Sequence, residues 1–365
     1  MNAKPIDLRE LTREEVIALV AELGEKPYRA KQVWEWLWKK HAPSVEAMSD
    51  LPKAFRAALA ERAVLRPLAM AEQQHSDDGT VKCALRTWDG HVVEAVLIPT
   101  EERITACVSC QIGCSLNCAF CATGLLKRIR NLTAGEIVDQ VVHIARLSVE
   151  LYQRPLTNIV SMGMGEPLLN YANVMRSTER INAEDGLGMS YRRITVSTAG
   201  IAKMIRQLGD DGAKFNLALS LHAPTDAKRS SFMPINDSNS IAELMGALRH
   251  YTRLTRKDIT FEYILFRDIN DSLEDARDLV RLCSQVNAKV NLIEYNATGD
   301  GRFQRSPADR ALAFQNFLQA KGITARIRRS RGRDIDAACG QLANKNRPAE
   351  DGGERLLKPA AAQKP

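Results

Sequence analysis

The sequence predicts an α/β fold, in which a parallel sheet is covered by helices and preceded by a small helical unit. Two patterns point to this class. From Ile104 to about residue 329, short apolar runs alternate with longer amphipathic stretches, and such strand–helix repeats build parallel sheets. Residues 1–65, in contrast, show helical periodicity alone. The repeats are compatible with a barrel-like sheet and with a doubly wound one.

The helical unit is predicted to span residues 1–65. Its helical periodicity is interrupted at Gly24 and Pro27 and then resumes. We expect helices at 12–24, 28–41 and 52–63. Trp34 and Trp38 lie four residues apart, so they share one helix face and are expected in the core of this unit. Lysines on its outer faces would suit a domain that docks on RNA.

Residues 66–103 are predicted to form a β-hairpin extension that leads into the core. The segment 81–99, VKCALRTWDGHVVEAVLIP, alternates apolar and polar residues around Asp89 and Gly90. An Asp-Gly pair between two such runs is a strong signal for a hairpin.

The α/β core is predicted to occupy residues 104–342. After a strand at 104–110, we expect strands at 157–162, 193–197, 214–221, 258–266, 288–295 and 323–329. Helices are expected at 133–150, 171–183, 199–208, 239–253, 272–285 and 306–320. Residues 343–365 are rich in Lys, Pro, Ala and Glu, and this composition predicts disorder.

The composition is that of an ordinary globular protein. The 365 residues leave room for a large domain and a smaller one, with 45% hydrophobic and 26% charged residues. The N-terminus lacks an apolar signal core, and no apolar run approaches the length of a membrane span. We therefore expect a cytoplasmic protein without a membrane segment, whose eight cysteines are kept reduced.

The charge is moderately basic. A net charge of +7 and a pI near 9.0 permit an anionic partner without identifying it. Basic residues gather at 26–40 and at 326–333, where RIRRSRGR holds five arginines. A solvated face is the ordinary explanation for one such stretch. Two of them beside one core favour nucleic acid, because phosphate neutralisation dominates its binding.

A run of cysteines carries the strongest chemical signal in the chain. Residues 107–121 read CVSCQIGCSLNCAFC, and Cys114, Cys118 and Cys121 have the spacing Cys-x3-Cys-x2-Cys. Three thiolates on one loop hold three irons of a cubane iron–sulfur cluster and leave the fourth iron open for a substrate or cofactor. A structural zinc site is the main alternative, but no second Cys or His pair follows at a distance. Disulfides suit a reducing compartment less well.

Polar residues are predicted to converge at one edge of the sheet. In parallel α/β proteins, chemistry gathers where the strands end, at their carboxyl edge. The cysteine run follows the strand at 104–110. Later strands are followed by Gly165 and Glu166, Ser197 and Thr198, Ser220 and His222, and Asn296. We therefore expect these side chains around one mouth.

Taken together, several motifs make the chain resemble the RlmN family of radical S-adenosylmethionine (SAM) RNA methyltransferases, which act on carbon 2 of adenosine. The resemblance extends from the N-terminal helices to residue 342. It rests on CVSCQIGCSLNCAFCATG (107–124), SMGMGEPLLN (161–170), ITVSTAG (194–200), LALSLHAP (217–224), NLIEYN (291–296) and RGRDIDAACGQL (331–342). The Cfr family, which methylates carbon 8 of the same adenosine, shares most of these motifs.

The resemblance implies a radical SAM partial (β/α)6-type barrel that holds one [4Fe-4S] cluster and SAM. Cys114, Cys118 and Cys121 would be the cluster ligands, and SAM would bind the open iron. The SAM pocket would consist of Gly165, Glu166, Ser197, Ser220, Leu221, His222 and Asn296.

The resemblance also implies a methyl carrier. One SAM would methylate Cys339, and a second would yield a 5′-deoxyadenosyl radical that removes a hydrogen from that methyl group. The carbon radical would add to adenine, Glu94 would take the ring proton, and Cys107 would release the covalent protein–RNA intermediate by forming a transient disulfide. The ordinary alternatives are two inert buried cysteines and an exposed strand glutamate.

The implied substrates are a peptidyl-transferase-centre adenosine of 23S ribosomal RNA and the adenosine at position 37 of some tRNAs. The cycle would need an electron donor such as flavodoxin with its reductase, and we expect a monomer. Carbon-8 methylation of the Cfr type and a non-catalytic, zinc-containing RNA-binding protein are the alternatives. The chain departs from the family at Cys110, where relatives usually carry serine, and at 297–306, where they often have a proline-containing loop.

Overall fold

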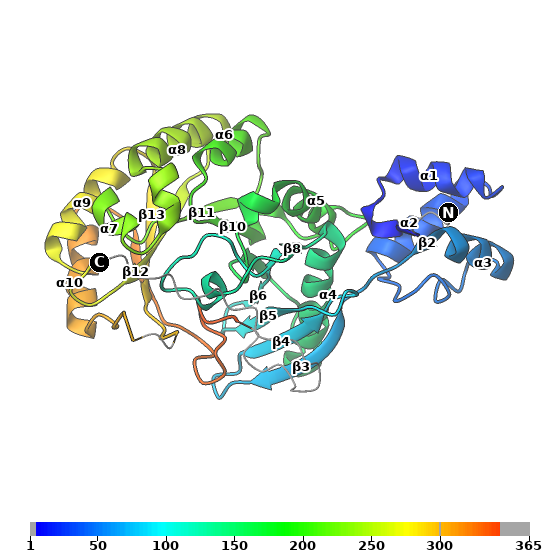
Figure 1. Ribbon diagram of the computed structural model, residues 1–365, viewed down its shortest axis with the longest axis horizontal. Helices are drawn as coiled ribbons and strands as arrows, with labels where there is room; N and C mark the ends of the chain where they lie inside the picture. Colours follow the sequence, from blue (N-terminus) through cyan, green and yellow to red (C-terminus); the bar gives the residue numbers. More distant parts are fainter. Residues whose placement is uncertain (1–4, 299–300, 344–365) are drawn as a thin grey trace.

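A ten-stranded sheet forms the core of the computed structural model, which describes residues 5–298 and 301–343 (Figure 1). Its strand order is β14-β13-β12-β11-β10-β9-β6-β5-β4-β3. The strands from β6 to β14 pair in parallel. They are β6 (Ile104–Cys107), β9 (Asn158–Ser161), β10 (Ile194–Thr198), β11 (Asn216–Ser220), β12 (Ile259–Leu265), β13 (Ala288–Glu294) and β14 (Ala325–Arg328).

Helices connect these strands and cover the outer face of the curved sheet (Figure 1). They are α4 (Ala134–Tyr152), α5 (Tyr171–Asn182), α6 (Ala202–Asp210), the short α7 (Asp226–Ser230), α8 (Ile241–Thr255), α9 (Leu273–Cys283) and α10 (Ala308–Ala320). Thr133, Ser240 and Ser272 start α4, α8 and α9 with capping boxes. The barrel is open, because β14 and β3 end the sheet without pairing to each other. The predicted fold class is confirmed.

Three antiparallel strands extend the sheet beyond β6. They are β3 (Ala69–His75), β4 (Val81–Arg86) and β5 (Val92–Pro99). The β4–β5 hairpin around Asp89 was predicted, but β3 was not. The seven residues of β3 read AMAEQQH and include few apolar side chains, so the strand lacks the usual apolar signal.

The helical unit contains α1 (Arg13–Glu22), α2 (Pro27–Trp38) and α3 (Lys53–Arg62), with a short parallel pair of β1 (Ile6–Asp7) and β2 (Ala63–Val64). Trp34 and Trp38 are buried, as expected. Several contacts fix the unit to the core, among them an ion pair and two hydrogen bonds. Arg9 forms a buried ion pair with Asp139 of α4, Arg176 of α5 donates to the carbonyl of Arg9 at 2.9 Å, and Trp34 Nε1 donates to Asp185 at 2.9 Å.

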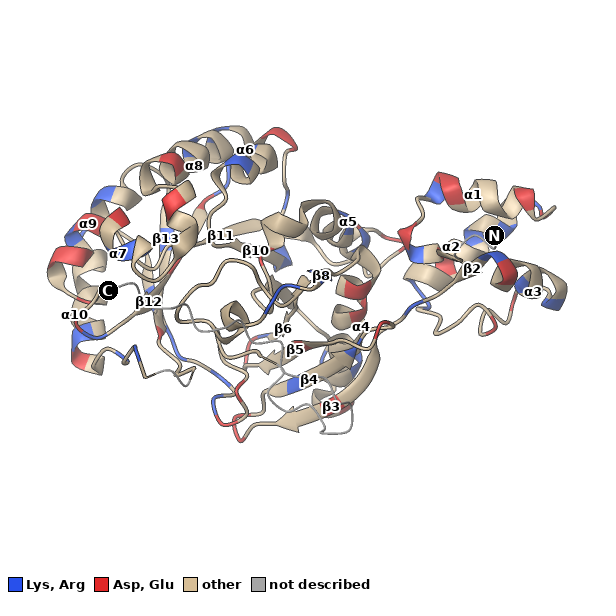
Figure 2. Cartoon of the chain, in the orientation of Figure 1, with Lys and Arg blue, Asp and Glu red and all other residues tan. Residues whose placement is uncertain are grey.

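Charges of both signs alternate along the outer helices (Figure 2). Within the residues that the structure describes, no helix is long and apolar enough to cross a membrane. Apart from residue 343, the predicted tail at 343–365 lies outside the described residues.

Candidate active site

The predicted site residues gather around one cavity at the carboxyl edge of the parallel strands. The predicted residues that line it are Cys114, Cys118, Cys121, Gly165, Glu166, Ser197, Ser220, His222 and Cys339. Four others, Glu94, Cys107, Leu221 and Asn296, lie outside this lining.

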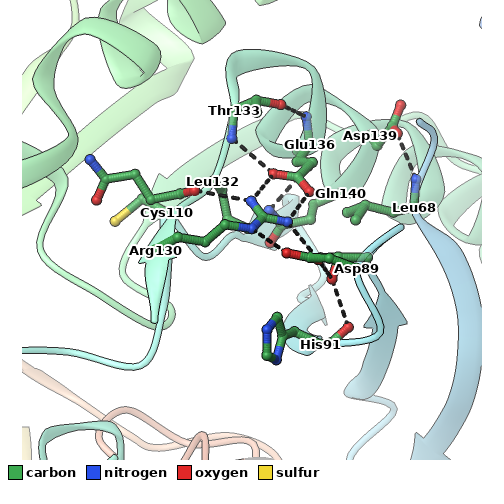
Figure 3. A network of polar contacts seen from close by, with 12 residues as sticks. Leu68, Asp89, His91, Cys110, Arg130, Leu132, Thr133, Glu136, Asp139 and Gln140 are labelled. Atoms are coloured by element: carbon green, nitrogen blue, oxygen red, sulfur yellow. Dashed lines mark hydrogen bonds and ion pairs between the residues drawn. The ribbon is translucent and has the colours of Figure 1, made fainter. Parts of the chain in front are cut away.

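The cysteine loop is anchored from behind by α4 (Figure 3). The Gln140 amide accepts a hydrogen bond from Ser109 N at 2.8 Å and donates one to Ser109 O at 3.0 Å. The carbonyl of Cys110 accepts from Leu132 N at 3.0 Å and from Asn170 Nδ2 at 2.8 Å. Because these bonds occupy the backbone of the loop, its shape is set before any ligand binds.

The three thiols fit a cubane cluster by position and by chemistry. Burial raises the pKa of the Cys118 and Cys121 thiols, so iron binding to their thiolates must displace protons. In residues 5–298 and 301–343, no three His, Cys, Asp or Glu side chains are close enough to share one metal ion. Cluster ligands each bind a different iron, so three sulfurs spread around a cavity match that need.

Gly113, one residue before Cys114, is the tightest glycine on the loop. Its φ is +73°, and a Cβ there would lie 2.1 Å from the carbonyl oxygen of Lys127. We expect Gly113→Ala to lower the free energy of unfolding by about 3 kcal/mol or more, from backbone strain and overpacking. Iron content should fall with it. The measurements are thermal unfolding and iron per protein.

Gly188→Ala is the matched control for this prediction. Gly188 also has a positive φ, +65°, but no atom lies within 4 Å of a Cβ added there. It should cost only the backbone strain, roughly 1 kcal/mol. Equal losses in the two variants would show that contact with Lys127 does not shape the cysteine loop.

The turn after β9 brings Gly165 and Glu166 against the cysteine loop. Gly165 has φ +99°, and a Cβ there would lie 2.5 Å from Gln111 Cβ. The Glu166 carboxylate accepts from Leu168 N at 3.0 Å and from Ala199 N at 2.7 Å. Burial raises the pKa of Glu166, and these backbone bonds oppose the shift. The carboxylate is thus held in place beside the cavity.

His222 presents one ring nitrogen as a donor. Its Nδ1 accepts from Ile264 N at 3.1 Å, so the neutral ring carries its proton on Nε2. Burial lowers the pKa of His222 to about 3, with the positive charge of Arg229 as the second cause. Ser197 Oγ lies 3.4 Å from Ser220 Oγ, beside the histidine. The Leu221 side chain is in the hydrophobic core, and its backbone donates to Glu262 O at 3.0 Å and accepts from Arg229 Nε at 3.0 Å.

The C-terminal segment brings Cys339 to the cysteine loop. Ala122 N donates to Gly340 O at 2.7 Å, and Asn296 Nδ2 donates to Cys339 O at 3.3 Å. Cys339 is exposed at the cavity, whereas Cys107 is buried. Burial raises the pKa of Cys107 to about 12, and the second cause is the charge of Cys339. A negative charge on Cys339 thus disfavours ionisation of Cys107, although the two residues are 232 positions apart in the sequence.

Comparisons with known proteins identify the family. The family model described as the ribosomal RNA large subunit methyltransferase N-terminal domain matches residues 6–65, and that of the radical SAM superfamily matches residues 108–282. A probable dual-specificity RNA methyltransferase RlmN of Christiangramia forsetii is 50% identical, over 93% of this chain and 97% of its own length. The chain belongs to the RlmN family. The RlmN of Anaeromyxobacter sp. is 48% identical over 94% of this chain and 92% of its own.

A solved structure supports the same family relationship. The crystal structure of a radical SAM methyltransferase from Sphaerobacter thermophilus superposes with a TM-score of 0.87 and 45% identity. The match covers 93% of this chain and 99% of the chain in that structure. The core of this RlmN-family chain has the radical SAM fold.

The sequence did not predict an ion pair at the cavity that the cysteines line. Glu262 of β12 lines the cavity, and Arg328 of β14 approaches its Oε2 at 3.5 Å. Asn291 donates to Glu262 Oε1 at 2.8 Å from the strand between them. Arg328 lowers the pKa of Cys339, opposing the increase from burial. Glu262 could have been singled out in the sequence, because it is the single acidic residue in the apolar strand ITFEYIL.

The basic segment 326–333 differs from expectation. Besides Arg328, Arg331 lies 3.9 Å from Asp78 and Arg333 pairs with Glu294. Much of its positive charge is therefore neutralised within the protein, by carboxylates that are distant in sequence. These pairings leave the stretch with less positive charge for the nucleic acid that its sequence favours.

Glu94, the expected proton acceptor of this RlmN-family chain, is buried and paired. It is 2% exposed, and its Oε1 lies 3.4 Å from Lys82 Nζ. Val96, two residues on and so on the same face of β5, packs with Cys107 and Ala337. Glu94 thus faces the same side of the sheet as Cys107.

Proposed function

We propose that this RlmN-family protein methylates carbon 2 of adenosine in 23S ribosomal RNA and in tRNA, with Cys339 as the methyl carrier. One observation carries the proposal: Cys339 and the three cysteines of Cys-x3-Cys-x2-Cys line the same cavity. Carbon 2 of adenine has no lone pair and does not attack a sulfonium methyl group. A radical delivered beside a methylated thiol overcomes that limit.

The residues around the cavity would hold both cofactors. Cys114, Cys118 and Cys121 would bind the cluster, and Glu166, the two serines and the Nε2–H of His222 would bind the polar groups of SAM, with Gly165 beside them. Leu221 and Asn296 lie outside the lining and would contribute from the ends of β11 and β13. When bound, the cluster and SAM supply one-electron cleavage to a 5′-deoxyadenosyl radical.

The chain's own residues would perform the remaining steps. The Cys339 thiolate takes a methyl group from one SAM, giving S-methylcysteine. That methyl group gives one hydrogen atom to the 5′-deoxyadenosyl radical, and its carbon bonds to carbon 2 of adenine. The ring proton goes to Glu94, and the adduct returns the one electron spent on SAM cleavage, so the ring regains its aromatic state. Cys107 sulfur then bonds to Cys339 sulfur, the bond from Cys339 sulfur to the transferred carbon breaks, and that carbon gains a proton.

Substrate access requires an exposed base, since enzymes that act on a base must take it out of the stack. We assign RNA docking to the helical unit, 1–65, with 66–103 as a linking extension, 104–342 as the catalytic core and 343–365 as a tail. A cytoplasmic monomer that receives electrons from a flavodoxin-type donor completes the proposal.

The test uses the purified, cluster-loaded protein with SAM and a reductant. Unmodified tRNA and a 23S ribosomal RNA fragment are supplied separately, and their nucleosides are measured by mass spectrometry. The proposal predicts 2-methyladenosine in both. Formation of 8-methyladenosine instead would establish the Cfr-type activity, and product in one RNA alone would end the dual-specificity claim.

Cluster binding gives a further prediction. Cys118→Ala removes one of the three thiolates, so the protein should lose its brown colour, its absorbance at about 400 nm and most of its iron. Cys83→Ala is the control, because Cys83 is buried in β4 away from the cavity. Iron analysis and absorbance check both variants. A colourless wild type that holds zinc would contradict the assignment.

A further inference from the structure

The turn of the β4–β5 hairpin lies at the same end of the sheet as the cavity. Val96 of β5 pairs with Cys107 at the carboxyl end of β6, and β5 runs in the opposite direction. Val92 therefore lies four residues, about 13 Å, beyond that end on the mouth side. Residues 87–91 form the turn above it. The function of this RlmN-family chain as described above assigns no role to this turn.

The turn carries an exposed tryptophan. Trp88 is 54% exposed, although an indole is among the side chains most readily buried. The Arg66 guanidinium lies 4.0 Å from the centre of its ring. An aromatic ring with an adjacent arginine is the arrangement on which unpaired nucleic-acid bases stack.

The turn is held rigidly (Figure 3). The Asp89 carboxylate accepts two hydrogen bonds from Arg130, at 2.7 and 2.9 Å, and Arg130 donates to Glu136 at 2.7 and 2.8 Å. The hydrogen bonds from Arg130 hold the pKa of Asp89 well below its usual range. A pre-ordered turn loses little conformational entropy when a ligand binds to Trp88.

Arg66 is fixed from the other side. Two residues later, Leu68 N donates to Asp139 at 2.9 Å, and Leu68 O lies 3.0 Å from His143 Nε2. Asp139 also pairs with Arg9 of the helical unit. The Trp88–Arg66 pair therefore sits where the helical unit, α4 and the hairpin meet.

The segment that links the cluster loop to this turn carries two exposed cations. Lys127 and Arg128 directly precede β8 (Arg130–Asn131), where Figure 2 shows a basic stretch. Lys127 O packs against Gly113, next to the cluster ligand Cys114, and Arg130 holds the hairpin turn. A continuous path thus runs from the cluster loop past two cations to Trp88.

We infer that Trp88 and Arg66 form a stacking platform for an unpaired base that flanks the target adenosine, with Lys127 and Arg128 contacting the adjoining phosphates. The inference rests on the proposed RNA methyltransferase function. RNA fits the surface because the target base must leave its stack, and its neighbours then need new stacking partners. The platform holds one neighbour while the target base enters the cavity.

The experiment compares Trp88→Ala, Trp88→Leu and Trp88→Phe in the full-length, cluster-loaded protein. The probe is a tRNA anticodon stem–loop. Affinity should fall about 10-fold in the Ala and Leu variants, because the ring is lost, and should stay within about 3-fold of wild type in the Phe variant. In methylation assays KM should rise, with kcat at saturating RNA nearly unchanged.

Salt dependence separates the two parts of the surface. Lys127→Ala and Arg128→Ala should each reduce the slope of log affinity against log salt by about 0.7, the value for a single strand. Trp88→Ala should leave that slope unchanged, because stacking releases no counterions. A changed slope in Trp88→Ala would overturn its assignment as a stacking residue.

Val149→Ala is the surface control. Val149 is 56% exposed on α4 and lies near the opposite end of that helix from Glu136. The affinity of Val149→Ala for the stem–loop should equal that of the wild type, and melting temperatures should match in all variants. Unchanged affinity in Trp88→Ala, or equal losses in the Phe and Ala variants, would overturn the platform while the methyltransferase function stands. Wild-type protein that neither binds nor methylates RNA would overturn both.

Discussion

Replacing Cys339 with alanine is expected to abolish RNA methylation while the cluster stays in place. Cys339 lines the cavity with Cys114, Cys118 and Cys121, but its sequence position is outside the three-cysteine motif. Without its sulfur, the methyl group has no acceptor. Loss of a covalent carrier should reduce the rate by at least roughly 1,000-fold. Product formation is measured by nucleoside mass spectrometry.

Two controls make this result specific. In Cys339→Ala, the iron content and the absorbance at about 400 nm should equal those of the wild type. Cys283→Ala, at a buried cysteine of α9, should retain full activity. If Cys339→Ala still methylates RNA, the methyl-carrier role is wrong, whatever the cluster content.

Replacing Cys107 with alanine is expected to trap the protein on its RNA. Cys107 is buried, the charge of Cys339 helps to raise its pKa, and Ala337 packs in the same hydrophobic cluster. Without the Cys107 sulfur, the bond between Cys339 and the transferred carbon has no thiolate to break it. A covalent complex that nuclease shortens should accumulate on denaturing gels, up to about one per protein.

The thiol pKa adds a pH dependence to the wild-type reaction. Burial raises the pKa of Cys107 to about 12, so its reactive thiolate becomes more abundant as the pH rises towards that value. Release of the covalent intermediate should therefore accelerate with increasing pH. In Cys107→Ala the complex should persist at every pH.

Cys110→Ala is the matched control for Cys107→Ala. Cys110 lies on the same loop and is also buried, but its Sγ lies 3.6 Å from the carbonyl of Met164 and does not line the cavity. It should turn over without accumulating a complex. Finding only free Cys107→Ala protein after reaction, or a complex in both variants, would remove the resolving role.

Local sequence patterns were sufficient for most of the fold. Amphipathic periodicity and capping residues such as Thr133 and Ser240 are local, so the helices and parallel strands follow from the residues themselves. The shared mouth followed from the rule that parallel strands end at one edge. Strand β3 was missed because its polar sequence depends on pairing with β4.

Contacts that depend on strand order lay beyond such reasoning. Glu262 of β12 and Arg328 of β14 pair across β13, the strand that lies between them. No local sequence pattern specifies this strand order. Similarly, the partner of Arg331 is Asp78, in the turn between β3 and β4. The Trp88–Arg66 pair also depends on the docking of the helical unit to α4. Besides strand β3, the missed features are therefore ion pairs and ring contacts between distant segments.

The most direct test of the central claim follows the methyl hydrogens. The protein is expressed in cells that lack their own carbon-2 enzyme and are grown on methionine with a fully deuterated methyl group, and RNA nucleosides are analysed by mass spectrometry. Transfer through Cys339 removes one deuterium and returns a solvent proton, so 2-methyladenosine should carry two deuterium atoms. A product with three deuterium atoms would mean direct transfer of an intact methyl group and would contradict the account.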